Sequence, residues 1–200
     1  TLVPTLIAAL AKRHPMLQLR YLEAEPPEAL AMLADGSLDV AITFRYPGDP
    51  ADPHDDLVGS TAVPLFHDPV QIVLPAGHHL GRRTDVRLAE LASEAWIAGC
   101  PLCRGHLLAA CSAEGVTPRI AHATDNSVAV LGLVAAGVGV ALQPALALEP
   151  LALPADTTIH DLRPTSDREV QAVHVRGAEA VPAIAAVLAA LVQITAARRA

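Results

Sequence analysis

Two stretches of the chain share one pattern, in which apolar residues at helical spacing end at a glycine and an apolar run follows. In the first, a helical pattern over 28–33 ends at Gly36 and 39–43 has the pattern of a strand; in the second, the helical pattern ends at Gly137 and 138–142 is the strand. Glycine ends a helix easily because it adopts the left-handed backbone without a Cβ penalty. A strand that is apolar on both sides is typical of a sheet covered by helices. The repeated unit predicts two similar α/β lobes, with a ligand cleft between them.

The same periodicities predict the remaining elements. Further helices are expected at 2–14, 88–91, 104–113, 126–136 and 182–195, and further strands at 17–22, 57–66, 70–74, 95–98, 119–123, 158–162 and 169–175. We expect Asp68-Pro69 to separate two extended segments, because proline cannot donate to a sheet. Asp125 is expected to cap the helix that follows it. Pro144 to Leu153 is expected to be a connector with at most one helical turn.

Composition narrows the class of protein. The 200 residues are 52% hydrophobic and 18% charged, which suits a well-buried α/β protein. Aromatic residues are 2% and the net charge is −7, so this polypeptide should not bind nucleic acid strongly by itself. We expect no membrane span, because no run of 18 apolar residues occurs. Three cysteines without a pairing framework and no export signal predict a cytoplasmic protein.

Several short motifs, taken in order, resemble the effector-binding domain of LysR-type transcriptional regulators. The matching segments are Leu2-Val3-Pro4, His14-Pro15, 33–42, Pro118-Arg119-Ile120-Ala121 and 133–144. Each motif alone is weak, whereas their order and spacing along nearly the whole chain are fairly specific. The resemblance implies two Rossmann-like lobes joined by two crossover strands, as in periplasmic solute-binding proteins. Lobe I would be 1–72 plus 172–200, and lobe II would be 73–171.

The resemblance also implies parts that are not in this sequence. The family has a strand before the helix at Leu2, in the middle of the sheet of lobe I, and an N-terminal winged helix-turn-helix that binds DNA. Without that strand, we expect lobe I to be unstable alone. The implied partners are a small-molecule effector, DNA through the absent winged helix-turn-helix, and further copies of the chain in a homodimer or tetramer. No cofactor and no membrane partner are expected.

In such a fold a ligand lies at the carboxyl ends of strands, where helix N-termini supply N–H donors. The predicted effector-binding residues are therefore Thr43, Phe44, Glu25, Pro26, Gly99, Cys100, Pro101, Thr124, Asp125 and Asn126. For Thr124 and Asp125, helix capping is the alternative that we favour, and Thr43 can equally be an ordinary strand end. The family often has Gly-x-Ser or Gly-x-Thr where this chain has Ala24-Glu25-Pro26. Since proline offers neither an N–H nor a hydroxyl, this departure favours a neutral or cationic effector over an aromatic acid.

Cys100, Cys103 and His106 form a Cys-x-x-Cys-x-x-His pattern, which has two chemical interpretations. The three side chains could bind a soft metal such as zinc, although no fourth ligand is evident. Alternatively, the two cysteines could cycle between dithiol and disulfide at a helix N-terminus. Some members of the family sense peroxide with paired cysteines in the equivalent segment, and Cys111 could be a more distant partner for Cys103. The alternative without function is that Cys111 packs in the core and the other two only border the cleft.

Other functions have less support. The loop 45–56 carries Asp52, His54 and further acidic residues, but it lacks calcium-loop spacing and should be solvated. An enzyme is not expected, because no Ser/His/Asp arrangement, phosphate-binding glycine loop or carboxylate pair is evident. A solute-binding protein of a transport system would share the fold, but we see no export signal or lipid-anchored cysteine. The prediction is a ligand-sensing regulatory domain, with a thiol or metal sensor as the alternative.

Overall fold

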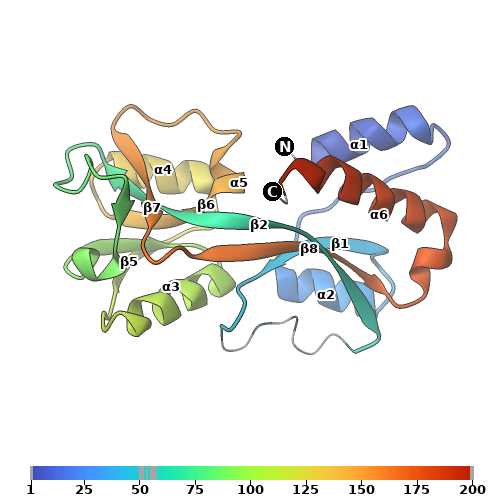
Figure 1. Cartoon of the computed structure of the whole chain (residues 1–200), viewed down its shortest axis with the longest axis horizontal. Coiled ribbons are helices and arrows are strands. Elements are labelled where there is room, and N and C mark those ends of the chain that lie inside the picture. Colours follow the sequence, from blue (N-terminus) through green and yellow to red (C-terminus); the bar gives the residue numbers. More distant parts are fainter. Residues whose placement is uncertain (1, 50–51, 53, 55–57, 199–200) are drawn as a thin grey trace. The chain divides into compact units, whose positions relative to one another are not determined.

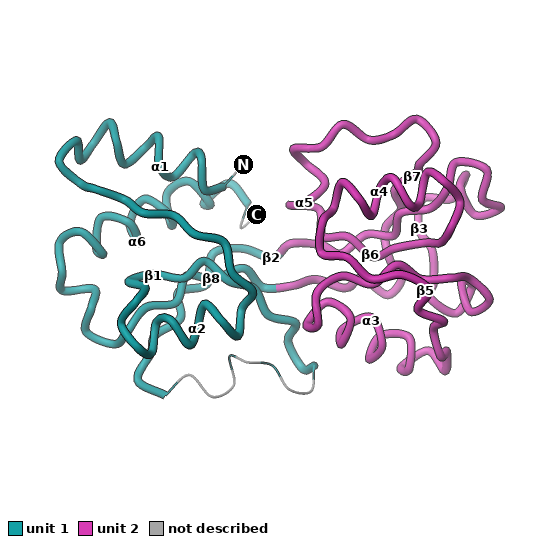
Figure 2. Tube along the Cα trace, turned by 180° about the vertical axis from the view of Figure 1, so that it is seen from behind, with its two compact units in different colours: residues 1–67, 169–200 teal, residues 68–168 magenta. Residues whose placement is uncertain are grey.

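The computed structural model describes residues 2–49, 52, 54 and 58–198. The chain divides into two compact units, which Figure 2 distinguishes by colour. Unit 1 consists of 1–67 and 169–200, and unit 2 is the continuous segment 68–168. The boundaries fall within two long strands that pass from one unit to the other, β2 (Ser60–Pro75) and β8 (Asp167–Val175). The boundaries predicted from the sequence lie in the same two strands.

Unit 1 is built from helices and from strands that lie far apart in the sequence. Besides parts of β2 and β8, it contains α1 (Leu2–Arg13), α2 (Pro26–Ala34), β1 (Val40–Arg45), η2 (Ala178–Ala180), α6 (Pro182–Thr195) and η3 (Ala196–Arg198). β1 pairs antiparallel with β8, and Ala41 lies opposite Val173. These two residues pack with Leu33 of α2 in one buried cluster. The apolar face of α2 therefore covers and buries one face of the β1–β8 strand pair.

Unit 2 has a mixed sheet with helices on both faces. Its elements are β3 (Asp85–Val86), η1 (Leu88–Leu91), β4 (Ala95–Ala98), α3 (Pro101–Ala113), β5 (Arg119–Ala123), α4 (Ser127–Ala135), β6 (Val140–Pro144), α5 (Ala145–Leu148) and β7 (Thr157–Leu162). β4 runs parallel to β5 and β6, whereas β2 runs antiparallel to β6 and β7. α3 and α4 cover opposite faces of this sheet (Figure 1). A covered sheet explains why β4 and β6 are almost entirely apolar.

The close pairing of β4 and β6 depends on a glycine. A Cβ atom at Gly139 would lie 2.7 Å from the carbonyl oxygen of Ala95, which is closer than real Cβ contacts. Gly137 precedes it with a φ of 72° and ends α4. One glycine thus supplies a left-handed backbone, and the other supplies the space that lets the next strand enter the sheet.

Three local predictions are wrong. The segment 17–22 forms no strand; Leu19 and Tyr21 are exposed, and no described strand pairs with it. Alternating apolar residues do not suffice for a strand without a hydrogen-bonded neighbour. Asp68-Pro69 does not divide two segments but lies inside the continuous β2, where the Asp68 carboxylate accepts the backbone N–H of Leu146. The third error, the cap of α4, concerns the site and is described there.

The remaining elements agree with the sequence patterns within a few residues. The two predicted segments in which a glycine separates a helix from a strand, at Gly36 and Gly137, are both present. The predicted connector after β6 contains the short α5. No helix in the described part of the chain combines the length and apolar character needed to cross a membrane.

Candidate functional site

In unit 1, a polar cluster lies at the carboxyl end of β1. Thr43 is the third residue from the end of this strand and is 5% exposed. Its hydroxyl oxygen lies 3.2 Å from Nε2 of His54. Nδ1 of His54 is 2.7 Å from Oδ1 of Asp52, which also accepts the backbone N–H of His54 at 2.9 Å. Since an ionised carboxylate only accepts, Nδ1 of a neutral His54 carries the proton and Nε2 accepts the Thr43 hydroxyl. A carboxylate, an imidazole and a hydroxyl thus form one relay.

The relay corrects two sequence-based expectations. Asp52 is 6% exposed and His54 is 5% exposed, so these two residues are not part of a solvated surface. Asp55 and Asp56 are among the further acidic residues of the loop 45–56 for which we predicted a solvated surface, and they lie outside the described residues. The sequence also gave no sign of a hydroxyl, histidine and aspartate arrangement. Thr43 and His54 lie 11 positions apart, and their meeting depends on the path of the chain after β1.

Charged groups surround the carboxylate end of the relay. Nε of Arg45 lies 2.9 Å from Oδ2 of Asp52 and 3.9 Å from a carboxylate oxygen of Glu169. One cation therefore faces two carboxylates, which leaves this end of the cluster negative when His54 is neutral. A second anion would be repelled here unless it brought its own counter-charge.

Gln171 on β8 completes the cluster. It is the register partner of Thr43 across the β1–β8 pair, so the two side chains lie on the same face. Gln171 is 5% exposed, and its Nε2 is buried without a hydrogen-bond partner among the residues that the structure describes. An unsatisfied buried donor costs about 1–3 kcal/mol, so such groups generally have a partner outside the chain, either a ligand or a water. The sequence prediction of the site did not include Gln171, because its pairing with Thr43 is a matter of strand register.

The other predicted residues of unit 1 contribute less. Glu25 is the residue before α2 and makes no capping hydrogen bond with its side chain, while Pro26 is buried at the first helical position. Phe44 points to the opposite face from Thr43, and its ring meets that of Tyr46 edge-on, with centroids 5.8 Å apart. Roles for these three residues in effector binding stay predictions.

In unit 2, Cys100 and Cys103 lie together at the N-terminus of α3. Neither forms a disulfide, and their sulfur atoms are 3.1 Å apart. Sγ of Cys100 also accepts the backbone N–H of Cys103 at 3.4 Å and so caps the helix. Gly99 keeps this corner narrow, since a Cβ there would lie 3.1 Å from Cβ of Cys103. Pro101 is exposed at the first position of α3. The geometry thus brings two of the three residues in the Cys-x-x-Cys-x-x-His pattern into contact.

The third residue, His106, is engaged elsewhere. Its Nε2 lies 2.7 Å from the hydroxyl oxygen of Ser166, in the chain leading to β8. Within the described ranges, no group of three or more His, Cys, Asp or Glu side chains could hold a metal ion. The sequence spacing therefore does not translate into a metal-ligand set.

Cys111 differs from the other two cysteines. It is fully buried in α3, and burial, with a smaller contribution from Glu114, raises the pKa of its thiol to about 11. A neutral, inaccessible thiol is a poor nucleophile. Cys111 therefore has the properties of a core residue, which was the alternative without function.

The N-terminus of α4 is capped by its own residues. Oδ1 of Asn126 accepts the backbone N–H groups of Val128 and Ala129, and the Thr124 hydroxyl accepts the N–H of Asn126. The cap is therefore Asn126 and not Asp125, which is exposed. The prediction placed the cap one residue early because Asp and Asn are equally good at this position. Two of the backbone N–H groups that we expected to bind a ligand at this helix N-terminus therefore donate to Asn126 instead.

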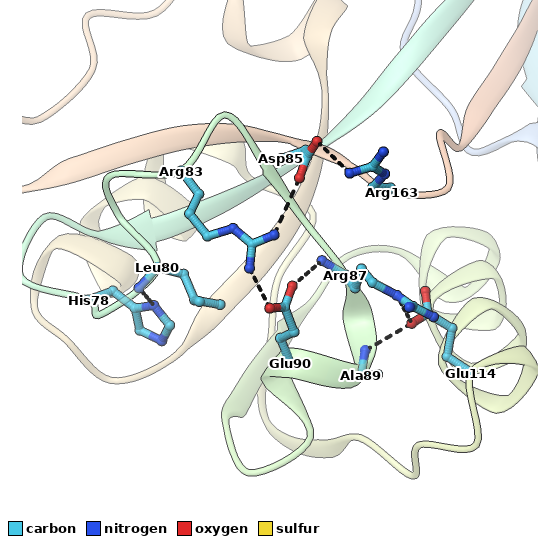
Figure 3. Close-up of polar contacts among 9 residues, drawn as sticks. All are labelled: His78, Leu80, Arg83, Asp85, Arg87, Ala89, Glu90, Glu114 and Arg163. Carbon is cyan, nitrogen blue, oxygen red and sulfur yellow. Dashed lines mark hydrogen bonds and ion pairs between the residues drawn. The ribbon is translucent and has the colours of Figure 1, made fainter.

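A network of charged side chains joins the segment from β3 to η1 (Figure 3). The Arg83 guanidinium contacts Glu90 and also Asp85, which in turn lies 3.5 Å from Arg163. The backbone N–H of Arg87 donates to Glu90 and, together with Arg83, holds the pKa of this carboxyl below its usual value. These groups are partly exposed, and the network serves to position a loop.

Comparison with known proteins gives a consistent result. The family described as "LysR substrate binding domain" matches residues 1–196. A probable hydrogen peroxide-inducible genes activator of Mycobacterium avium is 32% identical over 148 residues, covering 71% of this chain and 44% of that protein. The DNA-binding transcriptional dual regulator OxyR of Escherichia coli K12 is 29% identical over 154 residues, covering 74% of this chain and 47% of that protein. The chain thus spans less than half the length of these relatives.

Solved structures agree on the fold. The regulatory domain of CcmR from Synechocystis PCC6803, in complex with 2-PG, superposes with a TM-score of 0.83 at 14% identity, over 99% of this chain and 93% of that one. Full-length BenM carrying the E226K mutation gives 0.82 at 22% identity, over 98% of this chain and 64% of that one. The fold is of the periplasmic-binding-protein type, as the sequence motifs predicted. The chain belongs to the LysR substrate binding domain family, and is the effector-binding domain of a LysR-type transcriptional regulator.

Proposed function

We propose that this domain binds a small-molecule effector and that binding changes the arrangement of subunits in a dimer or tetramer of the regulator. DNA is bound by a part of the protein other than these residues, and the domain does not chemically convert its effector. The observation that carries the proposal is the buried polar cluster of Thr43, His54 and Gln171. It lies at the carboxyl end of a strand, where α/β folds bind ligands. Effectors act by stabilising one of two arrangements more than the other.

The experiment combines a binding screen with a measurement of assembly. Amino acids, aromatic acids, sugars and sugar phosphates are tested for a rise in melting temperature. A ligand at about 100 times its Kd adds about 2.7 kcal/mol to stability. Each hit is then tested by sedimentation for a change in oligomeric state, and by mass spectrometry for conversion. A hit that changes the assembly and is recovered unchanged supports the proposal; a hit converted to product contradicts it.

A second candidate is a thiol sensor that uses Cys100 and Cys103. Several of the curated relatives are peroxide-inducible activators by name, and the two sulfurs are already 3.1 Å apart. A disulfide needs roughly 2.05 Å, so an approach of about 1 Å suffices. One thiolate attacks the O–O bond of hydrogen peroxide and becomes a sulfenic acid, releasing hydroxide. The second sulfur then displaces the sulfenic oxygen as water, and the peroxide is reduced while two thiols become one disulfide.

The thiol sensor is tested by counting free thiols after peroxide treatment. Wild type is expected to lose two thiols reversibly, recover them with a reductant, and yield a peptide with Cys100 linked to Cys103. Cys111→Ala is the matched control and should behave like wild type, because its thiol is buried. Loss of the response in Cys111→Ala, or a linkage to Cys111 in wild type, would contradict the assignment to Cys100 and Cys103.

A further inference from the structure

We propose that Thr43, His54 and Gln171 form a subsite in unit 1 that binds a hydroxyl group of an uncharged ligand. The inference rests on the proposed effector-binding function and names the chemical group that this part of the site recognises. It is carried by one relay of hydrogen bonds, by one buried amide group that has no partner in the described part of the chain, and by the sign of the neighbouring charges.

The relay fixes which way the Thr43 hydroxyl points its proton. Asp52 accepts from Nδ1 of His54 at 2.7 Å, and in a neutral imidazole this leaves Nε2, 3.2 Å from Thr43, as an acceptor. The single hydroxyl proton of Thr43 is thereby committed to His54. What Thr43 can still offer is acceptance through the lone pairs of Oγ1, so it recognises a donor on the ligand.

Gln171 supplies the complementary group. Its Nε2 is a donor, is buried, and has no partner within the described residues. Gln171 stands opposite Thr43 in the register of β1 and β8, on the same face of the strand pair. An acceptor and a donor are thus presented side by side. One hydroxyl satisfies both, since its proton is donated to Thr43 and its lone pair accepts from Gln171.

The surrounding charge selects against anions. Along the same face, the next register pair is Arg45 and Glu169, and Arg45 is also paired with Asp52 at 2.9 Å. Among the described residues, two carboxylates thus lie beside the Arg45 guanidinium, and this local charge disfavours a ligand carboxylate or phosphate. An alcohol or a sugar fits this environment, whereas an aromatic acid would have to overcome repulsion.

The relay can be tested without any ligand. Two-bond nitrogen–proton correlation of the His54 ring in the intact chain at neutral pH should show the proton on Nδ1. Asp52→Asn should disturb that pattern, whereas Asp125→Asn, at an exposed residue of unit 2, should leave it unchanged. A proton on Nε2 in wild type would overturn the proposal, because Thr43 would then be free to donate.

Binding is tested with glucose, ribose, mannitol and myo-inositol, with glucose 6-phosphate and benzoate as anionic comparators. We expect at least one of the four uncharged compounds to raise the melting temperature, and Thr43→Val and Gln171→Met each to weaken its affinity about tenfold, the loss of one hydrogen bond. Thr195→Val and Gln143→Met are matched controls, because Thr195 donates to Leu191 and Gln143 donates to Leu142. The controls should bind as wild type does.

The outcomes separate this inference from the proposed function. Effects equal in the control variants, or a preference for the anions, would overturn the hydroxyl subsite and leave effector binding standing. If the uncharged compounds do not bind at all, the partner of Gln171 is a water and the subsite is likewise rejected. Failure of every compound class to change stability or assembly would instead count against the effector-binding function itself.

Discussion

Oδ2 of Asp68 accepts a hydrogen bond from Nε of Arg168 at 2.8 Å and lies 2.8 Å from Nη2 of the same guanidinium in an ion pair, although the two residues are 100 positions apart. Asp68 lies on β2 and Arg168 on β8, at the two ends of unit 2. Both are buried, and Oδ1 of Asp68 also accepts the backbone N–H of Leu146 at 2.8 Å. The ion pair therefore links the first and the last residue of the segment that forms unit 2.

Removal of the cation from this pair should be severe. Arg168→Met leaves the Asp68 carboxylate buried without its counter-ion, and we expect a loss of about 3–5 kcal/mol in the free energy of unfolding, measured by urea denaturation. Arg163→Met is the control, because its partner Asp85 is 3.5 Å away and its side chain is 69% exposed; it should change stability by less than about 0.5 kcal/mol. Equal effects of the two substitutions would contradict the importance of the buried pair.

The contact between β4 and β6 predicts that Gly139 tolerates no side chain. Gly139→Ala places a methyl group 2.7 Å from the carbonyl oxygen of Ala95, so the strands must separate. We expect a loss of about 1–3 kcal/mol in thermal or urea unfolding. Gly132→Ala, in α4 with nothing within 4 Å of the added atom, should instead gain about 0.5–1 kcal/mol. A neutral Gly139→Ala would mean that β6 is more loosely held than the structure indicates.

The cap of α4 gives a third prediction. Asn126→Ala removes the acceptor of two backbone N–H groups and should cost about 0.5–2 kcal/mol in unfolding free energy. Asp125→Ala is the matched control, and should have a much smaller effect because Asp125 does not cap the helix. A larger loss of stability in Asp125→Ala than in Asn126→Ala would contradict this assignment and would favour Asp125 as the cap, as the sequence predicted.

Cys111 predicts a dependence of stability on alkaline pH. Because folding raises the pKa of this thiol from 9.0 to about 11, the folded state holds the proton more tightly than the unfolded state in that interval. The stabilisation is complete below pH 9 and is lost as the pH rises toward 11. Cys111→Ala should therefore show a shallower fall in the free energy of unfolding from pH 9 to 11 than wild type. Identical slopes would contradict the raised pKa.

The sequence predicted the parts of the fold that depend on local patterns. The Gly36 and Gly137 junctions, with a helix before and a strand after, were correct because a left-handed glycine and an apolar run are local signals. The strand expected at 17–22 failed because strand formation needs a neighbour, and a neighbour is a long-range property. The family also followed from the order of short motifs, as the match over residues 1–196 bears out.

The candidate site was less accessible to sequence reasoning. Thr43 was selected because it follows an apolar run, but Gln171 is brought opposite it only by the register of two strands more than 120 positions apart. His54 and Asp52 were assigned to a solvated loop on composition alone, whereas both are buried. Burial of a polar residue depends on its partners, and those partners are visible only in three dimensions.

The discontinuity of unit 1 has a consequence for synthesis on the ribosome. Unit 2 is one uninterrupted stretch and can fold as soon as it has emerged, whereas β1 must wait for β8 to be translated before it gains its antiparallel neighbour. Until β8 has been translated, β1 lacks the antiparallel neighbour that it has in the described structure, and the nascent chain exposes a strand edge that chaperones would recognise.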